Sequence, residues 1–189
     1  MRIIAGKYRG RKLREFAGKS VRPTSDRVKE SLFQILSERL RGARVLDLFC
    51  GSGALGLESL SRGAAEVVFN DISSDSLRIL RDNLALLKES AAITNLDFRT
   101  ALNCARGKFD LIFADPPYSE DFRAELLGLV RKNALLNAGG LVVLESEREE
   151  PCEDGWEIAD TRRYGRTKIF FFRLCERDSS VAAVGRNDR

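Results

Sequence analysis

The sequence of 189 residues contains no histidine. This absence excludes His-based catalytic triads, histidine metal ligands and histidine general bases, so any proton transfer must use carboxylates, Lys, Tyr or Cys. The four cysteines, Cys50, Cys104, Cys152 and Cys175, are scattered and form no Cys-x-x-Cys pair. This spacing disfavours a disulfide framework and a thiolate metal cluster, and we expect reduced thiols and no bound metal.

Long hydrophobic runs are also missing. The longest apolar stretches, such as LIFA and IFFF, are much shorter than the roughly 18 residues that a membrane-spanning helix needs. The N-terminus, MRIIAGKYRGRKL, has no secretory hydrophobic region. We therefore expect a cytoplasmic protein that makes no contact with a membrane.

Positive charge is concentrated at the N-terminus. Residues 1–43 hold 12 Lys or Arg against 4 Asp or Glu, whereas the rest of the chain is slightly acidic. A basic arm of this kind favours a polyanionic partner, although a solvated basic face would have the same composition. If the arm binds RNA, we expect that removing residues 1–20 weakens RNA binding and spares cofactor binding.

The hydrophobic pattern predicts an α/β domain. A short hairpin and a helix over residues 25–41 come first, and strand and helix patterns alternate from residue 44. The strands are expected at 44–49, 66–71, 93–98, 109–115, 140–146, 156–160 and 167–174, and the helices between them at 54–62, 74–87 and 124–136. Such alternation is typical of a Rossmann-like, mostly parallel sheet, here seven-stranded with a final antiparallel strand. We expect a basic extension at 1–43, a domain at 44–175 and a disordered tail at 176–189.

A glycine-rich loop follows the strand predicted at 44–49. The segment VLDLFCGSGALG places Gly51, Gly53 and Gly56 in G-x-G-x-x-G spacing, and Asp71 ends the next strand. This context indicates a nucleotide site, in which the glycines permit close backbone approach and the acid binds ribose hydroxyls. A tight strand-to-helix turn without a ligand would contain the same glycines.

Asp47 discriminates between the cofactors that use this loop. A carboxylate beside the pyrophosphate of a dinucleotide would repel it, whereas the cationic amino acid end of S-adenosylmethionine would stabilise a buried acid. The alternative is that Asp47 only caps the amides of the loop. A nicotinamide oxidoreductase is disfavoured further because the chain has no separate substrate domain and no histidine.

The strand predicted at 109–115 ends in Asp115-Pro116-Pro117-Tyr118. Two consecutive prolines fix φ and remove backbone donors, so this corner presents a carboxylate, free carbonyls and an aromatic ring together. Asp115 and the carbonyl of Pro116 can accept the two N–H groups of a planar amine, while Tyr118 stacks on the base that carries it. A simple turn that ends in a core aromatic residue is the alternative.

These segments together resemble a known family. VLDLFCGSGALGLESLSRGA, Asp71 and FDLIFADPPY are similar to class I S-adenosylmethionine-dependent methyltransferases that modify amino groups. RIIAGKYRGRKL, RPTSDRVKESLFQIL and YGRTKIFFF resemble more narrowly the bacterial RsmD family of small-subunit ribosomal RNA guanine-N2 methyltransferases. The resemblance implies S-adenosylmethionine as cofactor and 16S ribosomal RNA, within an assembling or assembled small subunit, as partner. Nothing in the sequence suggests more than a monomer.

The resemblance also implies roles for three sets of residues. The target amine is expected to meet Asp115, Pro116, Pro117 and Tyr118. The cofactor is expected to contact Asp47, Phe49, Gly51, Gly53, Gly56, Asp71, Ile72, Thr100 and Ala101. The RNA is expected to contact Arg9, Arg11, Lys12, Arg22, Thr24, Arg27, Lys29 and Tyr164. One position departs from the family, because many such enzymes carry an acid after the third strand for the adenine amino group, whereas FRTALN offers Thr100 and Ala101.

Other functions remain compatible with parts of this pattern. A DNA adenine-N6 or protein glutamine methyltransferase can use a similar corner, although no target-recognition insertion for DNA is visible. A catalytically silent RNA-binding assembly module could share the fold. The presence of Asp47, Asp71 and Asp115 argues against a silent module.

Overall fold

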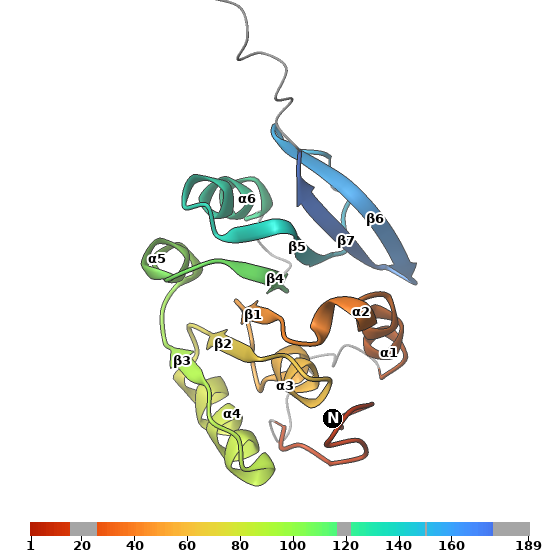
Figure 1. Ribbon diagram of the computed structural model, residues 1–189, viewed down its shortest axis with the longest axis vertical. Coiled ribbons are helices and arrows are strands. Elements are labelled where there is room, and N and C mark those ends of the chain that lie inside the picture. The colour runs from red at the N-terminus through yellow and green to blue at the C-terminus, as the bar shows by residue number, and fades with distance from the viewer. Residues whose placement is uncertain (16–25, 117–121, 150, 176–189) are drawn as a thin grey trace, which may run out of the picture.

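A seven-stranded sheet forms the middle of the computed structural model, which describes residues 1–15, 26–116, 122–149 and 151–175 (Figure 1). The strands are β1 Arg44–Asp47, β2 Glu66–Asn70, β3 Ala92–Thr94, β4 Phe109–Ala114, β5 Leu136–Ser146, β6 Trp156–Tyr164 and β7 Thr167–Leu174, in the spatial order β3-β2-β1-β4-β5-β7-β6. Neighbouring strands from β3 to β5 are parallel, and β7 is antiparallel to both β5 and β6. The predicted sheet is confirmed.

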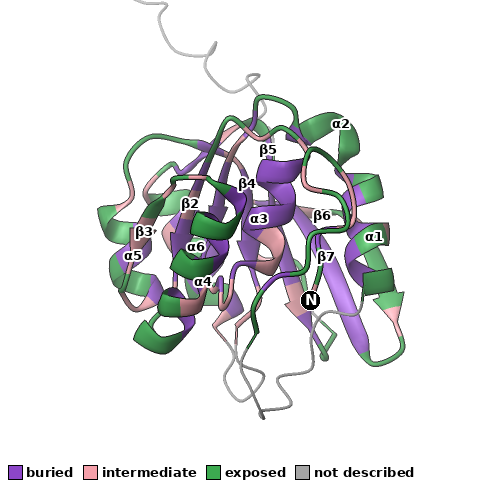
Figure 2. Cartoon of the chain, turned by 90° about the horizontal axis from the view of Figure 1, so that it is seen from below, coloured by how far each residue is buried: buried purple, intermediate pink, exposed green. Residues whose placement is uncertain are grey.

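Helices cover both faces of the sheet. One face carries α1 Asp26–Ile35, α2 Ser37–Leu40, α3 Ala54–Ser61 and α4 Ser74–Leu87, and the other carries α5 Phe98–Cys104 and α6 Arg123–Lys132. Because successive strand residues point to opposite faces, Val45 packs with the first group of helices and Leu46 with the second. Figure 2 shows the buried strands enclosed between helices whose outer surfaces are exposed. No helix within the described ranges has the length and hydrophobicity that crossing a bilayer would need.

The region after β3 differs from the prediction. The strand expected at 93–98 ends at Thr94, and α5, which was not predicted, begins at Phe98. The side chain of Asp97 accepts hydrogen bonds from the backbone N–H groups of Arg99 (3.0 Å) and Thr100 (3.3 Å). This cap stabilises the start of a helix and so ends the extended segment before it.

The N-terminal segment, residues 1–15, packs against the domain. In place of the predicted hairpin strands, the structure has one isolated antiparallel bridge between Arg2 and Lys12. Ile3 and Leu13 are buried in the same hydrophobic cluster as the residues of α1, α3 and α4. The hydrophobic side chains of the segment therefore contribute to the core of the domain.

A buried carboxylate holds this segment in place. Glu58 of α3 is completely buried and accepts hydrogen bonds from the backbone N–H groups of Ile4 (2.8 Å) and Ala5 (3.0 Å) and from Nε of Arg62 (2.8 Å). Nζ of Lys29 lies 3.5 Å from the Glu58 carboxylate. Burial lowers the pKa of Lys29, and the charge of Glu58 partly offsets that decrease.

The prediction that Lys29 contacts RNA is therefore wrong. Lys29 is 1% exposed, and its ammonium donates a hydrogen bond to the backbone carbonyl of Arg2. The position of Lys29 on α1 explains its burial. Leu32 and Phe33 follow it by three and four residues, so they lie on the same face of the helix, and both are also buried. The sequence shows the positive charge of Lys29 but does not show its buried partner, because Glu58 belongs to another helix.

We predict that Glu58→Gln lowers the free energy of unfolding by about 3 kcal/mol, because the ammonium of Lys29 stays buried without its carboxylate. Urea denaturation would measure the loss, and Glu58→Gln/Lys29→Met should recover part of it. The control Glu66→Gln removes a largely exposed partner of Arg44 and should cost less than about 1 kcal/mol. A Glu58→Gln protein as stable as the wild type would contradict this role of the pair.

Candidate active site

A row of carboxylates lies along the carboxyl ends of the parallel strands. Asp47 ends β1, Asp71 follows β2, Asp97 and Asp115 lie after β3 and β4, and Glu145 lies near the end of β5. Strand order reverses between β1 and β4, which is where open sheets of this kind bind their ligands. In the described part of the chain, no three potential ligand side chains group closely enough to hold a metal ion. The charge of the row favours a cationic ligand.

The loop between β1 and α3 has the backbone that its glycines predict. Gly51 and Gly53 have φ values of 54° and 93°, which residues other than glycine rarely adopt. A Cβ atom at Gly53 would lie 2.5 Å from Leu80, and one at Gly56 would lie 2.2 Å from the ring of Phe69. A Cβ at Gly51 would meet nothing within 4 Å. Internal packing thus accounts for Gly53 and Gly56, and the open space for a ligand is at Gly51.

Asn83 connects this loop to the N-terminal segment. Its side chain is completely buried, and Oδ1 accepts a hydrogen bond from the backbone N–H of Arg14 (2.7 Å). Nδ2 donates to the carbonyls of Arg14 and Ser52, both at 3.1 Å. Deleting residues 1–20 would therefore remove a partner of the residue that holds the glycine loop, which the sequence did not indicate.

Asp47 and Asp71 both bind the backbone of the loop. Asp47 accepts a hydrogen bond from the N–H of Gly56 (2.8 Å), and Asp71 accepts from Gly51 (2.7 Å) and Ser73 (2.8 Å). Burial raises the pKa of Asp47 to about 7, and the charge of Asp71 adds to the rise, which the Gly56 hydrogen bond opposes. Asp47 does cap a loop amide, and a nearby cation would favour its ionised form.

Two hydrophobic candidates flank these acids. Phe49 is half-buried, and its ring centroid lies 5.7 Å from that of Phe98 in α5. Ile72 follows Asp71 and is 74% exposed. Nδ2 of Asn95 donates to the backbone carbonyls of Asp71 (2.8 Å) and Ile72 (2.9 Å), which fixes this turn. The turn therefore presents an acid and an apolar surface side by side.

Thr100 and Ala101 do not lie at a strand end. Thr100 is exposed in the first turn of α5 and its hydroxyl donates to Asp97, whereas Ala101 is buried against the hydrophobic cluster of α5 and α6. The hydrogen bond from Thr100 holds the pKa of Asp97 below its usual range. Asp97 is the acid after the third strand. The signal for it in the sequence is an Asp placed before hydrophobic residues at helical spacing, Phe98, Ala101 and Leu102.

Asp115 and Pro116 follow β4 in the middle of the carboxylate row, and Pro117 and Tyr118 lie outside the described residues. Burial raises the pKa of Asp115 well above its usual range, and the charges of Glu145 and Asp47 raise it further. A ligand that brings positive charge or N–H donors to this position would be stabilised.

The turn of the N-terminal segment that carries Arg9 lies away from this edge. Arg9, Arg11 and Lys12 are exposed. The turn that carries Arg9 docks on the C-terminal end of α3, where the N–H of Lys7 donates to the carbonyl of Ser61 (2.8 Å). Because α3 begins at the glycine loop, this turn lies at the far end of the helix.

The remaining RNA candidates lie on or near α1. Arg27 is exposed in the first turn of α1. Tyr164 is half-buried, and its hydroxyl is hydrogen-bonded to that of Ser31 (2.5 Å). Arg22 and Thr24 lie outside the described residues.

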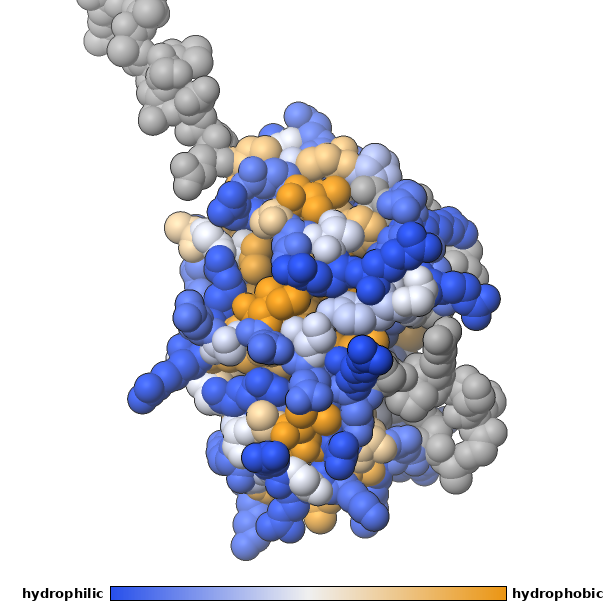
Figure 3. Space-filling model, turned by 90° about the vertical axis from the view of Figure 1, so that its right-hand side faces the viewer, coloured by the Kyte–Doolittle hydropathy of each residue, from blue (hydrophilic) through white to orange (hydrophobic). Residues whose placement is uncertain are grey.

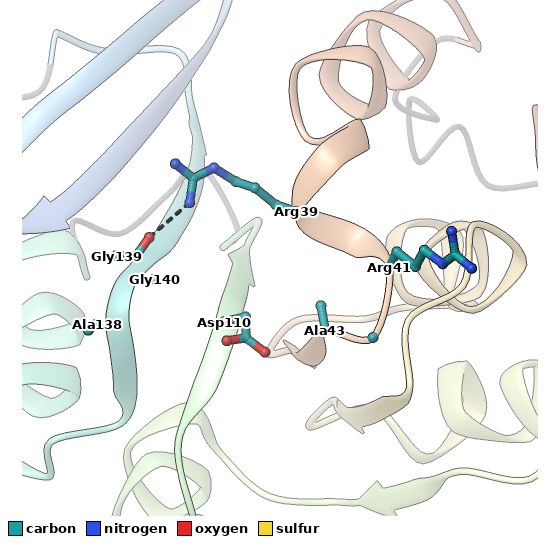
Figure 4. Close-up of a pocket in the computed structure, with 8 residues that line it drawn as sticks. Arg39, Arg41, Ala43, Asp110, Ala138, Gly139 and Gly140 are labelled. Atoms are coloured by element: carbon teal, nitrogen blue, oxygen red, sulfur yellow. Dashed lines mark hydrogen bonds between the residues drawn. The ribbon is translucent and has the colours of Figure 1, made fainter.

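A separate pocket lies at the opposite, amino-terminal edge of the sheet (Figure 4). Its volume is about 300 Å³, and its lining consists of Arg39, Arg41, Gly42, Ala43, Asp110, Ala138, Gly139 and Gly140. Nη1 of Arg39 donates to the carbonyl of Gly139 (2.9 Å), and Asp110 accepts from the N–H of Arg44 (2.8 Å). The pocket contains none of the candidate site residues.

Comparison with known proteins shows which family the chain resembles. The family model described as Conserved hypothetical protein 95 matches residues 1–173. The chain is 35% identical to ribosomal RNA small subunit methyltransferase D of Haemophilus influenzae, over 87% of this chain and 89% of that protein. The protein of the same name from Escherichia coli is 39% identical, over 79% of this chain and 76% of its own length.

Solved structures show the same relationship. The structure of yhhF from Escherichia coli matches with a TM-score of 0.83 and 35% sequence identity, over 92% of this chain and 97% of that one. A structure from Thermus thermophilus, described as the hypothetical protein TTHA0928, matches with a TM-score of 0.78 and 32% identity, over 90% and 98% of the two chains. The chain therefore belongs to the RsmD family of class I methyltransferases, whose model is described as Conserved hypothetical protein 95.

Proposed function

We propose that this protein transfers a methyl group from S-adenosylmethionine to the exocyclic N2 amine of a specific guanine in 16S ribosomal RNA. The observation that carries the proposal is the position of Asp115 and Pro116, directly after β4 at the point where strand order reverses. The names of the relatives support small-subunit ribosomal RNA as the substrate class. Guanine N2 follows from the resemblance to the RsmD enzymes.

The residues at the carboxyl edge fit this cofactor. S-adenosylmethionine supplies an electrophilic methyl group on a positively charged sulfur. Asp47 and Asp71 provide negative charge next to the open space at Gly51, and the exposed Ile72 offers an apolar surface for adenine. The pyrophosphate of a dinucleotide would be repelled by the carboxylate of Asp47. We assign the adenine amino group to Asp97 instead of Thr100.

Asp115 and Pro116 would orient the target amine. The lone pair of guanine N2 is delocalised into the ring, so the amine is a poor nucleophile until its hydrogens are held out of the plane. The carboxylate of Asp115 and the carbonyl of Pro116 would accept these two N–H groups and turn the lone pair toward the methyl group. The carboxylate would also stabilise the positive charge that develops on nitrogen. The carboxylate could then take the proton that the methylated amine releases, because a protonated guanine amine is a stronger acid than a carboxylic acid.

Tyr118 would stack on the base, and the guanine must be unstacked from its neighbours to enter.

The decisive experiment is mass mapping of ribosomal RNA from cells that lack this protein. The proposal requires the loss of one methylguanosine from 16S RNA. An unchanged set of modified guanosines in 16S RNA would refute it.

We predict that Asp115→Ala lowers the methyl-transfer rate by on the order of 100-fold, by removing an acceptor for the target amine. Single-turnover kinetics would measure the rate, and calorimetry should show nearly unchanged affinity for S-adenosylmethionine. Asp110→Asn changes an acid at the other end of the same strand and is the control. Wild-type turnover in the Asp115 variant would exclude its role.

Affinity for S-adenosylmethionine should increase from about pH 6 to about pH 8. The raised pKa of Asp47, about 7, means that the free protein carries a neutral carboxyl group at the lower pH and a carboxylate at the higher one. Only the carboxylate attracts a cation. Calorimetry should show that Asp47→Asn flattens this pH profile and weakens binding most at high pH. If the variant keeps the wild-type pH profile, the ionisation of Asp47 does not affect the affinity for S-adenosylmethionine.

The choice between Asp97 and Thr100 can be tested directly. Asp97→Ser keeps a helix-capping hydroxyl but withdraws the carboxylate, and it should raise KM for S-adenosylmethionine about tenfold. Thr100→Val should change this KM less than about twofold, because Thr100 lies in the first turn of α5 and its hydroxyl bonds to Asp97. The reverse order of effects would return the adenine contact to Thr100.

A further inference from the structure

The turn that joins β6 and β7 lies at the same edge of the sheet as the candidate active site. We call residues 162–168 the hairpin tip. Ser146, at the carboxyl end of β5, pairs with Lys168, which pairs with Arg163. Because β5 is parallel to β4, the hairpin tip and the carboxyl end of β4 face the same way (Figure 1). Strands lie about 4.8 Å apart, so the three steps from β4 to β6 place the hairpin tip roughly 15 Å from Asp115.

The hairpin tip is strongly basic. Its sequence, RRYGRTK, contains four cationic residues and no acid. Two of these are neutralised within the fold, since Arg162 pairs with Asp160 at 2.7 Å and Lys168 pairs with Glu149. The hairpin tip therefore has two further positive charges, on Arg163 and Arg166.

Arg163 and Arg166 have donors available for a ligand. Nε of Arg163 donates to the carbonyl of Gly165 at 3.2 Å, and the residue is exposed. Arg166 is exposed, and no hydrogen bond or ion pair of its side chain occurs within the described ranges. A guanidinium with free N–H groups matches the geometry of a phosphate.

The base of the hairpin tip is held firmly. The hydroxyl of Tyr164 is hydrogen-bonded to Ser31 of α1, and Thr167 is buried. Gly165 has a φ of 65°, so the turn takes a backbone conformation that favours glycine. Arg27, one helical turn before Ser31, lies on the same side of α1. Figure 3 shows this side of the molecule, where small hydrophobic patches are separated by hydrophilic side chains.

Acids lie along the carboxyl edge from β3 to β5, and Arg163 and Arg166 lie at its β6 and β7 end. The acids at β1 to β4 would repel the phosphates of an RNA strand that brings a base to Asp115. Arg9, in the N-terminal segment, is held at the far end of α3 and does not offset this repulsion. Cations at the β6 and β7 end of the edge can offset it, because they lie beside the acids on the same side of the sheet.

We propose that Arg163 and Arg166 bind phosphate groups of the RNA strand that delivers the target base to Asp115. This inference rests on the proposed function, and it assigns part of the substrate-binding surface to the C-terminal hairpin. The two arginines position the strand and take no part in methyl transfer. Their loss should therefore change the concentration of RNA needed and leave the rate at saturation unchanged.

The test uses Arg163→Gln/Arg166→Gln in the full chain and small ribosomal subunits from cells that lack this methyltransferase. We expect KM for subunits to rise about tenfold, with kcat and KM for S-adenosylmethionine within about twofold of wild type. The slope of log(kcat/KM) against log salt concentration should become shallower by about one to two. Arg163→Lys/Arg166→Lys should restore most of the loss, because the charges remain.

The matched control is Arg106→Gln/Lys108→Gln, which removes two exposed charges before β4 at the opposite edge. It should leave KM for subunits unchanged. Wild-type KM and salt slope in the Arg163/Arg166 variant, or an equal loss in the control, would overturn the proposal.

Filter binding to purified 16S RNA, measured in parallel over the same salt range, separates this result from failure of the proposed function. A shallower slope only in the hairpin-tip variant would support the phosphate contacts even if subunits are not methylated, and equal slopes would contradict them.

Discussion

The parallel pairing of β1 with both β2 and β4 is the constraint on which the candidate site depends. Asp47 is level with Phe69 of β2 and with Phe113 of β4. Asp71 and Asp115 each follow these phenylalanines by two residues, so three carboxylates from distant parts of the sequence meet at one edge. A shift of one residue in either pairing would move an acid by about 3.3 Å along the strand. Backbone hydrogen bonds in the sheet thus fix the spacing of the chemical groups.

Much of this arrangement could be predicted from local patterns. The alternation of strands and helices predicts the sheet, and the positions of Gly51, Asp71 and Asp115 relative to their strands predict the candidate site. These features depend on residues within one strand–loop–helix unit, and such units fold in a limited number of ways.

The features that could not be predicted depend on contacts between distant residues or on the end of an element. Lys29 was assigned to the surface because its buried partner, Glu58, lies in a different helix. Asp97 was overlooked because a short strand was extended through the residue that caps α5. The charge of Arg163 and Arg166 is plain in the sequence, but only the pairing of β7 between β5 and β6 brings it to the edge that holds Asp115.

The hydrogen bonds of Asn83 link the stability of the glycine loop's conformation to the docking of the N-terminal segment. One buried amide binds Arg14 on one side and Ser52 on the other. Any ligand that favours the observed conformation of the loop also favours the docked segment, and by reciprocity a partner that holds the segment changes ligand affinity by the same factor. Through Asn83, the docking of a basic segment at one end of the chain and the shape of the glycine loop would therefore respond to each other's ligands.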